Sequence, residues 1–485
     1  MIQFLLNQNL KTLDDVDPNT TVLNWLRGSE HRCGSKEGCA SGDCGACTIV
    51  LGQVDGEKMR YDTANSCITL ISQLDGKQLL TVEDLSAGEE LHPVQQAMAD
   101  CHASQCGFCT PGFVMSGFAL QKANSGRDRH EIEKGLAGNL CRCTGYHPII
   151  DAMQKSCVPA TDKFSHAEPE TVSRLQALQR PDTSELKKSN RCLLPKSVSQ
   201  LAVLYLENPQ ARLLAGGTDL ALTITQQYQT LPLIIGMNQI DELKTITVSE
   251  SQIRIGAMAA LQACHETLLP VIPAFARVLD RFASPQIRHH ATLAGNLANA
   301  SPIGDGAPML LALGAELELR RGDALRRLPL DEFFLSYRKT ALQRGEFISA
   351  VIINRNDISP TFCAWKISKR MDDDISTVFG AFNLEFNGDV VTGARLAFGG
   401  MAATPVRAKS AEQALMGSPL THQTVLRACE ALAADFQPLT DFRGSGRYRL
   451  KVAQNLLRRL ALQLTEQPHA LEVQNYSMEE QPHVN

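Results

Sequence analysis

The chain has 485 residues, a net charge of −5, 44% hydrophobic residues and 20% charged residues. This composition is ordinary for a soluble globular protein, and the length exceeds what one hydrophobic core usually holds, so we expect two to four domains. The negative charge gives no electrostatic reason to expect nucleic-acid binding. The longest apolar runs, such as Met309–Ala315, fall far short of the roughly 18 residues that span a bilayer, so no membrane association is expected.

Cysteine is the informative residue type. The chain has fifteen cysteines, and eleven of them lie between Cys33 and Cys157. The N-terminal residues Met1–Leu10 have no basic stretch and no small-residue cleavage site, so we expect a first β-strand there, not a signal peptide. In a reducing compartment, cysteines more often bind metal or carry out redox chemistry than form disulfides. We therefore expect a cytoplasmic protein with cysteine-bound metal.

Residues 1–85 predict a β-grasp domain of the α+β class, with strands at Ile2–Leu6, Thr48–Leu51 and Gln78–Thr81 and a short helix at Thr20–Leu26.

Four cysteines of this domain have the spacing C-x4-C-x2-C, with the fourth twenty residues further on. This spacing is typical of the plant-type 2Fe–2S ferredoxins. Three thiolates converge on a compact cluster from one tight loop, and the glycines of the loop let backbone N–H groups approach the sulfurs. A structural zinc loop is the alternative, although zinc sites usually pair their ligands as two C-x2-C units. The predicted ligands are Cys39, Cys44, Cys47 and Cys67.

A second set of four cysteines lies in residues 86–157, where apolar residues have helical spacing, so we expect a small helical-bundle domain. Two pairs of thiolates near helix ends suit one pair of irons, because helix N-termini favour an anionic cluster. Alone, the C-x2-C and C-x-C pairs fit zinc or a redox dithiol equally well. Beside the first set they favour a second 2Fe–2S cluster. The predicted ligands are Cys106, Cys109, Cys141 and Cys143; the predicted helices are His92–Cys101, Gly112–Ala123 and Arg129–Leu136.

Three further regions follow. Residues 158–190 are polar, contain three prolines and lack a strong apolar stripe, which predicts a linker that crosses a surface. Residues 191–356 alternate strand and helix patterns and predict an α+β or α/β domain. Residues 357–470 predict a smaller α+β domain, and the polar tail after Gln467 is expected to fray. In this last domain we expect strands at Thr377–Leu384 and Val390–Phe398 and helices at Ala411–Met416, Gln423–Ala434 and Tyr448–Leu464.

A Gly-Gly-Thr turn follows the strand-like run Leu213–Ala215. Gly216 and Gly217 let backbone N–H groups approach an anion, so the turn can cradle a pyrophosphate, with a simple turn as the alternative. It is not the G-x-G-x-x-G fingerprint of a Rossmann fold. The small and polar run Ala291–Asp305 suits close contact with the same ligand and offers Asp305 to a ribose hydroxyl, although an ordinary loop explains it equally well.

The segments Gln105–Phe113 (QCGFCTPGF) and Asn139–Tyr146 (NLCRCTGY) resemble the second-cluster motifs of the molybdenum hydroxylases, the xanthine dehydrogenase/aldehyde oxidase family. The stretch Lys36–Cys47 is similar to the first-cluster motif of that family. The resemblance covers about residues 1–465. It implies two 2Fe–2S clusters on the eight cysteines, with Gln105 approaching the pterin of a molybdenum cofactor that a partner chain holds.

The resemblance continues into an FAD-binding domain of the vanillyl-alcohol-oxidase/carbon monoxide dehydrogenase flavoprotein type, through Phe282–Ser284, Tyr337–Thr340 and Lys366–Ile375. It implies that the charged loop Lys369–Asp374 borders the site where a nicotinamide reaches the flavin, with a solvated hairpin as the alternative. Asn299 stands where the family often has threonine, and either side chain can hydrogen-bond phosphate. The resemblance implies FAD contacts for Leu214, Ala215, Gly216, Gly217, Thr218, Asp219, Leu220, Phe282, Thr292, Gly295, Asn296, Asn299, Asp305 and Lys366.

The family resemblance implies electron transfer from the partner's molybdenum through the helical-domain cluster, the ferredoxin-like cluster and FAD to NAD⁺. No part of the chain resembles the molybdenum domain, so the hydroxylation residues are expected on a second chain, in a heterotetramer of two small and two large chains. Hypoxanthine and xanthine are the expected substrates, with aldehydes or other N-heterocycles as alternatives. A non-catalytic iron–sulfur carrier and a structural zinc protein are the remaining hypotheses.

Overall fold

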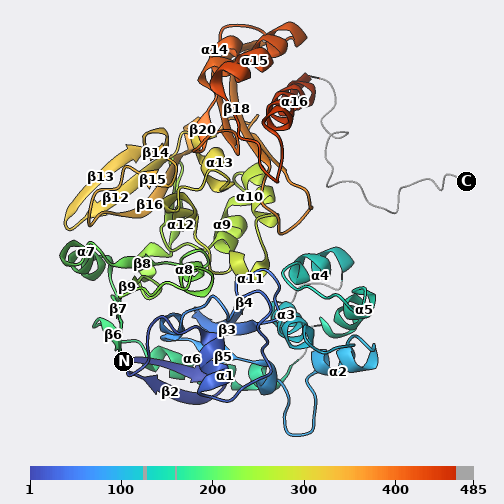
Figure 1. The fold of residues 1–485 in the computed structure, drawn as a ribbon, viewed down its shortest axis with the longest axis vertical. Helices are drawn as coiled ribbons and strands as arrows, with labels where there is room; N and C mark the ends of the chain where they lie inside the picture. The colour runs from blue at the N-terminus through green and yellow to red at the C-terminus, as the bar shows by residue number, and fades with distance from the viewer. Residues whose placement is uncertain (124–127, 159–160, 466–485) are drawn as a thin grey trace, which may run out of the picture.

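The computed structural model describes residues 1–123, 128–158 and 161–465 and arranges them as four successive units (Figure 1). The tail expected after Gln467, and residues 466–470 of the predicted C-terminal domain, lie outside the described residues. Within the described ranges, no helix is both long enough and apolar enough to cross a bilayer.

The N-terminal unit confirms the predicted β-grasp fold. Its elements are β1 (Ile2–Leu6), β2 (Asn9–Leu13), α1 (Val22–Gly28), β3 (Thr48–Asp55), β4 (Lys58–Asn65) and β5 (Gln78–Leu80). The strand order is β2-β1-β5-β3-β4, in which β1 and β5 run parallel. The hydroxyl of Thr21 accepts from the Asn24 N–H and starts α1, whose Trp25 packs edge-to-face on Phe4 of the sheet. The helix therefore covers the apolar face of the sheet.

The second unit is the predicted helical domain. It contains α2 (Pro93–Asp100), α3 (Thr110–Lys122), α4 (Arg129–Leu136) and α5 (His147–Ser156). The three expected helices are present, and α5 is an addition that begins directly after the C-x-C loop with a proline in its first turn. Phe118 of α3 is fully buried and contacts the rings of His92 and Phe164. The helices thus close around one aromatic centre.

The segment 158–190 crosses a surface, as expected, but it does so as a helix and not as an irregular linker. The helix α6 (Lys163–Ala177) packs against β3 and β4 of the first sheet. Its Phe164, Val172 and Leu175 are buried. The segment, expected to lack a strong apolar stripe, therefore has one with widely spaced apolar residues, and the helix continues past Pro169. The following strand, β6 (Ser184–Lys187), already pairs with the next domain, which therefore starts before residue 191.

The third unit has two main sheets and a separate two-stranded sheet formed by β14 and β15. The smaller sheet, of order β6-β7-β9-β8, has β7, β9 and β8 parallel. The larger sheet is antiparallel, of order β10-β11-β16-β12-β13. The elements are β7 (Arg191–Leu194), α7 (Val198–Glu207), β8 (Arg212–Leu214), α8 (Leu220–Thr225), β9 (Leu233–Gly236), β10 (Ile246–Val248), β11 (Gln252–Gly256), α9 (Leu261–Leu268), α10 (Pro273–Asp280), α11 (Pro285–Arg288), α12 (Leu293–Ala298), α13 (Gly306–Ala312), β12 (Glu316–Arg321), β13 (Ala324–Pro329), β14 (Phe334–Ser336), β15 (Lys339–Thr340) and β16 (Phe347–Asn354).

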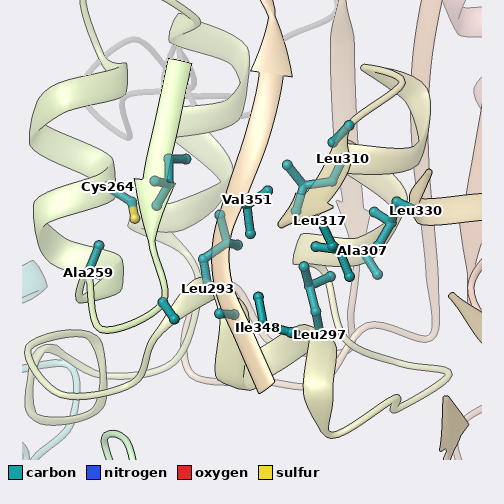
Figure 2. Packing of buried hydrophobic residues seen from close by; sticks show 14 of the residues in the cluster. Ala259, Cys264, Leu293, Leu297, Ala307, Leu310, Leu317, Leu330, Ile348 and Val351 are labelled. Atoms are coloured by element: carbon teal, nitrogen blue, oxygen red, sulfur yellow. The ribbon is translucent and has the colours of Figure 1, made fainter. Parts of the chain in front are cut away.

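Two cores hold this unit in place. In the larger one, shown in Figure 2, Leu293 and Leu297 of α12 share a buried cluster with Ile348 and Val351 of β16. The smaller sheet packs against the β-grasp domain, because its Leu214 and Ile234 share a buried cluster with residues of that domain. Because burial of apolar surface drives this packing, the first domain and the small sheet share one hydrophobic core. This shared core brings the loop after β8 against Gln73, six residues beyond Cys67.

The C-terminal unit is an antiparallel sheet of order β17-β18-β19-β20 with three helices, and it sits at the top of Figure 1. The predicted strands and helices are all present. The elements are β17 (Cys363–Ile367), β18 (Val378–Asn387), β19 (Val390–Gly399), β20 (Val406–Arg407), α14 (Lys409–Leu415), α15 (His422–Asp435) and α16 (Gly446–Thr465).

Candidate functional site

The first cysteine set lies in the loop before β3 and in the turn after β4. Cys47 Sγ is 3.3 Å from Cys67 Sγ, and both side chains are buried. Cys39 contacts the thiols of Cys44 and Cys67, and these contacts lower the pKa of the Cys39 thiol. The same contacts with Cys39 raise the pKa values of Cys44 and Cys67. The four predicted ligands are therefore brought together in one place.

The loop around this set is shaped for anionic sulfur. The backbone N–H of Asp43 donates to Cys39 Sγ at 3.3 Å, and that of Ser41 lies at 3.5 Å. Gly42 has a φ of +84°, and a Cβ at Gly38 would lie 2.8 Å from Cys44 Sγ. Glycine is needed where a backbone approaches a cluster this closely. Backbone donors to sulfur and a tight Gly-rich loop fit an iron–sulfur cluster.

The second set connects the N-terminus of α3 with the loop before α5. Cys143 Sγ is 3.6 Å from Cys106 Sγ, while Cys109 contacts Cys141. Burial raises the pKa of the Cys109 thiol to about 12. Burial also acts to raise the pKa of Cys141, but hydrogen bonds from Thr144, Cys143 and Cys109 together outweigh it and lower that pKa to about 7. This set, too, forms a compact group of four sulfurs.

Among the described residues, no group of three or more His, Cys, Asp or Glu side chains is arranged around a single metal ion. In the first set, Cys39 contacts Cys44 and Cys67, and Cys67 also contacts Cys47. In the second set, Cys106 contacts Cys143, and Cys109 contacts Cys141. A 2Fe–2S cluster requires four neighbouring thiolates of this kind, two for each iron.

The two sets touch through the backbone. The N–H of Leu140, the residue before Cys141, donates to the carbonyl of Cys44 at 3.0 Å. A Cβ on Gly45 would lie 2.2 Å from the carbonyl oxygen of Gly138, so no side chain fits between the two loops. One hydrogen bond thus joins Cys44, a predicted ligand of the first cluster, to Leu140, which directly precedes Cys141, a predicted ligand of the second.

The first cysteine loop also touches the third domain. Gln226, which follows α8, donates from its side chain to the carbonyls of Cys39 at 3.1 Å and Ala40 at 2.9 Å. On the other side, the buried Gln73 donates to the carbonyl of Gly216 at 3.0 Å. Neither glutamine was singled out from the sequence, because each meets its partner across more than 140 residues of chain. Only the fold reveals them.

The Gly-Gly-Thr turn follows β8, as predicted. Gly217 has a φ of +81°, and a Cβ on Gly216 would lie 1.9 Å from the carbonyl oxygen of His290. Leu214 is fully buried in the shared core, so only its backbone is available to a ligand, whereas Asp219 is exposed. The turn therefore presents backbone and the hydroxyl of Thr218, which suits contact with a phosphate.

The second predicted flavin segment forms α12 and the loop after it. The hydroxyl of Thr292 accepts from the Gly295 N–H at 3.0 Å and caps the helix. Asn296 Oδ1 is buried without a hydrogen-bond partner, and a Cβ on Gly306 would lie only 2.8 Å from it. Asn299 ends the helix and is half-buried. An unpartnered amide oxygen beside glycine backbone fits a site that a polar ligand completes.

Asp305 was expected to bind a ribose hydroxyl, but in the structure its carboxylate bonds to two side chains of the protein. Its Oδ2 lies 2.6 Å from Lys366 Nζ, and its Oδ1 accepts from the Ser376 hydroxyl at 2.6 Å. Asp305 and Lys366 are 3% and 4% exposed. Two predicted flavin residues are thus joined in a buried ion pair, which leaves the carboxylate only its remaining lone pairs for a ligand. Ser376 was not singled out from the sequence.

The charged loop 369–374 lies beside Phe282. Arg281 donates to the carbonyl of Met371 at 3.0 Å, and the half-buried ring of Phe282 follows directly in the chain. Within the loop, Asp374 accepts from the backbone N–H groups of Lys369 and Arg370. Burial, followed by the neighbouring charge of Asp43, raises the pKa of Asp373 to about 6. The loop is thus hydrogen-bonded to the third domain through Arg281, and Asp373 lies close enough to Asp43 of the first cysteine loop for the two carboxylates to repel each other.

Three family models match successive parts of the chain. A [2Fe-2S] binding domain matches residues 81–154, an FAD binding domain in molybdopterin dehydrogenase matches residues 187–355, and a CO dehydrogenase flavoprotein C-terminal domain matches residues 363–464. The match to the flavin-domain family starts at residue 187, the last residue of β6.

Similar proteins include xanthine dehydrogenases. The chain is 32% identical to that of Drosophila pseudoobscura pseudoobscura over 89% of its own length, and 33% identical to that of Emericella nidulans over 90%. It spans 37% and 36% of the length of these relatives.

Solved structures agree on the fold. The carbon monoxide dehydrogenase from Hydrogenophaga pseudoflava matches 58% of this chain and 96% of its own, at 27% identity and a TM-score of 0.52. The quinoline 2-oxidoreductase from Pseudomonas putida 86 matches 56% of this chain and 94% of its own, at 24% identity and a TM-score of 0.52, and is evidence of the fold alone. The chain belongs to the molybdenum hydroxylase family, of which it carries the 2Fe–2S and FAD-binding domains.

Proposed function

We propose that the chain passes electrons from a molybdenum cofactor on a partner through two 2Fe–2S clusters to FAD, and from there to NAD⁺. The observation that carries the proposal is the continuous contact between the three candidate sites. Leu140 bonds to Cys44, and Gln226, at the C-terminal end of the helix α8 that follows the Gly-Gly-Thr turn, bonds to Cys39. Centres held on rigid, touching loops are what one-electron transfer in series requires.

The residues around the clusters hold the iron atoms and adjust the reduction potentials of the clusters. Thiolates bind iron, and N–H or hydroxyl donors to sulfur stabilise the reduced, more negative cluster. Asp43 supplies such a donor in the first set and Thr144 in the second. The cluster ligands are proposed to be Cys39, Cys44, Cys47 and Cys67 in one set and Cys106, Cys109, Cys141 and Cys143 in the other.

The flavin would lie along the Gly-Gly-Thr turn and the loop after α12. Bound FAD exchanges hydride with a nicotinamide and single electrons with iron–sulfur clusters. The chain's part is to present the backbone of Gly216 and Gly217 to the pyrophosphate, to complete the bonding of Asn296, and to hold Phe282 near the ring system. Loop 369–374 would border the nicotinamide.

The partner would dock on the second cluster. Cys106 and Cys143 are exposed, and Phe108, Leu140 and Tyr146 around them are 46%, 48% and 37% exposed. Apolar side chains grouped around exposed candidate ligands are typical of an interaction surface. Gln105 is exposed at the same place, where it can reach a pterin. Two copies of each chain are the expected assembly.

The substrate is proposed to be hypoxanthine or xanthine, because the similar proteins named above are xanthine dehydrogenases. Other N-heterocycles or aldehydes are the second candidate, because the family resemblance of the chain is shared by hydroxylases of those substrates. The substrate pocket belongs to the partner, so the partner's sequence separates the two.

Anaerobic purification of the full chain tests the electron-transfer function. We expect four irons, four acid-labile sulfides and one FAD per chain, and two paramagnetic signals after dithionite reduction. NADH should bleach the flavin and reduce the clusters. Zinc in place of iron would overturn the proposal. Iron and FAD without any reaction with NADH would support a carrier that serves another acceptor.

A further inference from the structure

Four buried polar side chains meet where the two cysteine loops touch, and one of them comes from the flavin domain. Thr48 belongs to the β-grasp domain, Ser116 and Asn139 to the helical domain, and Gln286 to α11 of the flavin domain. All are 3% exposed or less. Polar side chains this deeply buried are costly unless they are bonded to one another, so their arrangement is specific.

Asn139 is the centre of this group. Its Nδ2 donates to the carbonyl of Gly45 at 3.1 Å, and its Oδ1 accepts from Ser116 Oγ at 2.7 Å. Gly45 follows Cys44, and Asn139 precedes Leu140, so the bond lies beside the single backbone hydrogen bond that joins the two loops. The orientation of the Asn139 amide therefore determines how closely the two cluster loops approach.

Gln286 determines that orientation. Its Nε2 donates to Asn139 Oδ1 at 3.0 Å and to Thr48 Oγ1 at 3.2 Å, with Ser116 Oγ at 3.4 Å. If the Asn139 amide turned over, its NH₂ group would face the NH₂ group of Gln286, and its oxygen would face the carbonyl of Gly45. Both contacts are repulsive. Gln286, a residue of the flavin domain, thus fixes the orientation of the Asn139 amide between the two cluster loops.

The fit around Gln286 is tight. A Cβ on Gly138 would lie 2.1 Å from Gln286 Oε1, and that oxygen has no hydrogen-bond partner. A glutamine kept with an unpartnered buried carbonyl is unfavourable for stability alone. Its position at a junction of three domains therefore points to a role other than stability.

We propose that Gln286 is a positioning residue for electron transfer between the two clusters: the flavin domain, through this side chain, holds the Leu140–Cys44 hydrogen bond at its working length. The inference rests on the proposed function. Electron tunnelling falls steeply when a hydrogen bond on the route lengthens or breaks. Loss of the Gln286 amide should therefore slow the step between the clusters, while the step between FAD and the first cluster, which Gln226 and Gln73 adjoin, is left unchanged.

The test compares the full-length chain with its Gln286→Met variant, which keeps the length of the side chain but loses the donors. Gln78→Met is the matched control, because Gln78 is also fully buried, donates through Nε2 and has an unpartnered Oε1, but lies in β5. Each protein is checked for iron, sulfide and FAD, mixed with NADH and frozen at successive times. Electron paramagnetic resonance then follows the two cluster signals separately.

We expect reduction of the ferredoxin-like cluster at the wild-type rate and reduction of the helical-domain cluster at least tenfold more slowly in Gln286→Met, with both rates normal in Gln78→Met. Equal rates for both clusters in Gln286→Met would overturn the inference. Should that variant lose its iron, Ser116→Ala removes another hydrogen bond to the same Asn139 oxygen, and an unchanged rate there would overturn it as well. A wild-type chain without reducible clusters would instead refute the proposed function.

Discussion

The ammonium group of Lys366 in β17 lies 2.6 Å from the Oδ2 of Asp305 at the start of α13, and both side chains are almost completely buried. The pair connects the flavin domain to the C-terminal unit. The Ser376 hydroxyl completes the carboxylate's bonding, so the ion pair is enclosed by protein on both oxygens.

Removing the charge of Asp305 should destabilise this connection. In Asp305→Asn the buried ammonium of Lys366 loses its counter-ion, and breaking a buried pair in this way costs about 3–5 kcal/mol. We expect a clearly lower thermal unfolding midpoint and weaker retention of FAD during gel filtration. The control is Glu133→Gln, which breaks the exposed Arg129–Glu133 pair and should cost about 0.5 kcal/mol or less. Equal midpoints in the two variants would contradict the prediction.

A methyl group at Gly216 should expel the flavin. The Cβ of Gly216→Ala would lie 1.9 Å from the His290 carbonyl oxygen, a backbone atom that cannot swing away, so the turn must move. We expect at least a tenfold loss of FAD affinity, measured by titration of the apoprotein with FAD, while iron and sulfide contents stay at wild-type levels. Gly28→Ala, where a Cβ meets no atom within 4 Å, is the control. Normal FAD binding by Gly216→Ala would remove this turn from the flavin site.

Thr144 should tune the second cluster. Its hydroxyl lies 3.1 Å from Cys141 Sγ, and its backbone N–H donates to the same sulfur at 3.4 Å. Thr144→Val removes the hydroxyl donor but keeps the backbone bond. Because donors to sulfur stabilise the reduced cluster, the midpoint potential of this cluster should become more negative.

A redox titration followed by paramagnetic resonance measures that shift, with the first cluster as an internal reference. Thr110→Val is the control, because the hydroxyl of Thr110 bonds to Ser104 and not to sulfur. An unchanged or more positive potential in Thr144→Val would mean that this hydroxyl does not act on the cluster.

The parts of the molecule that the sequence predicts are those determined locally. The spacing of Cys39, Cys44 and Cys47 is contained in nine residues, and the Gly-Gly-Thr turn follows its strand directly. The helix α6 escaped prediction because Phe164, Val172 and Leu175 are widely spaced among polar residues, and their burial depends on a sheet formed by another part of the chain.

The contacts between domains escaped prediction for a related reason. Gln226 meets Cys39 across 187 residues, and Gln286 meets Asn139 across 147. Neither glutamine stands in a recognisable motif. In the sequence alone, a polar residue whose partner is far away along the chain cannot be distinguished from an ordinary surface residue. The pairing of Asp305 with Lys366 is similar: the sequence favours a role for each near the flavin, but only the fold shows that they bond to each other.

His290 should make stability depend on pH. Its ring lies between the flavin domain and the β-grasp sheet, where Nε2 bonds to the carbonyl of Thr63 at 3.2 Å. Burial, with the positive charge of Lys77 nearby, lowers the pKa of His290 from 6.5 to about 3. Between these two values the unfolded chain binds a proton that the folded chain does not. The contribution of His290 to the free energy of unfolding therefore falls as pH falls from about 6.5 towards 3, by about 1.4 kcal/mol per pH unit.

His290→Gln keeps a donor for Thr63 and removes the titrating ring, so the variant should lose less stability on acidification than the wild type. Burial also lowers the pKa of His289, so we expect the slope to become smaller without vanishing. Thermal unfolding midpoints between about pH 6.5 and pH 5 measure the slope, with the exposed His166 replaced by Gln as the control. If His290→Gln and His166→Gln both keep the wild-type slope, protonation of His290 does not oppose folding, and the contact between the flavin domain and the β-grasp sheet tolerates a charged ring.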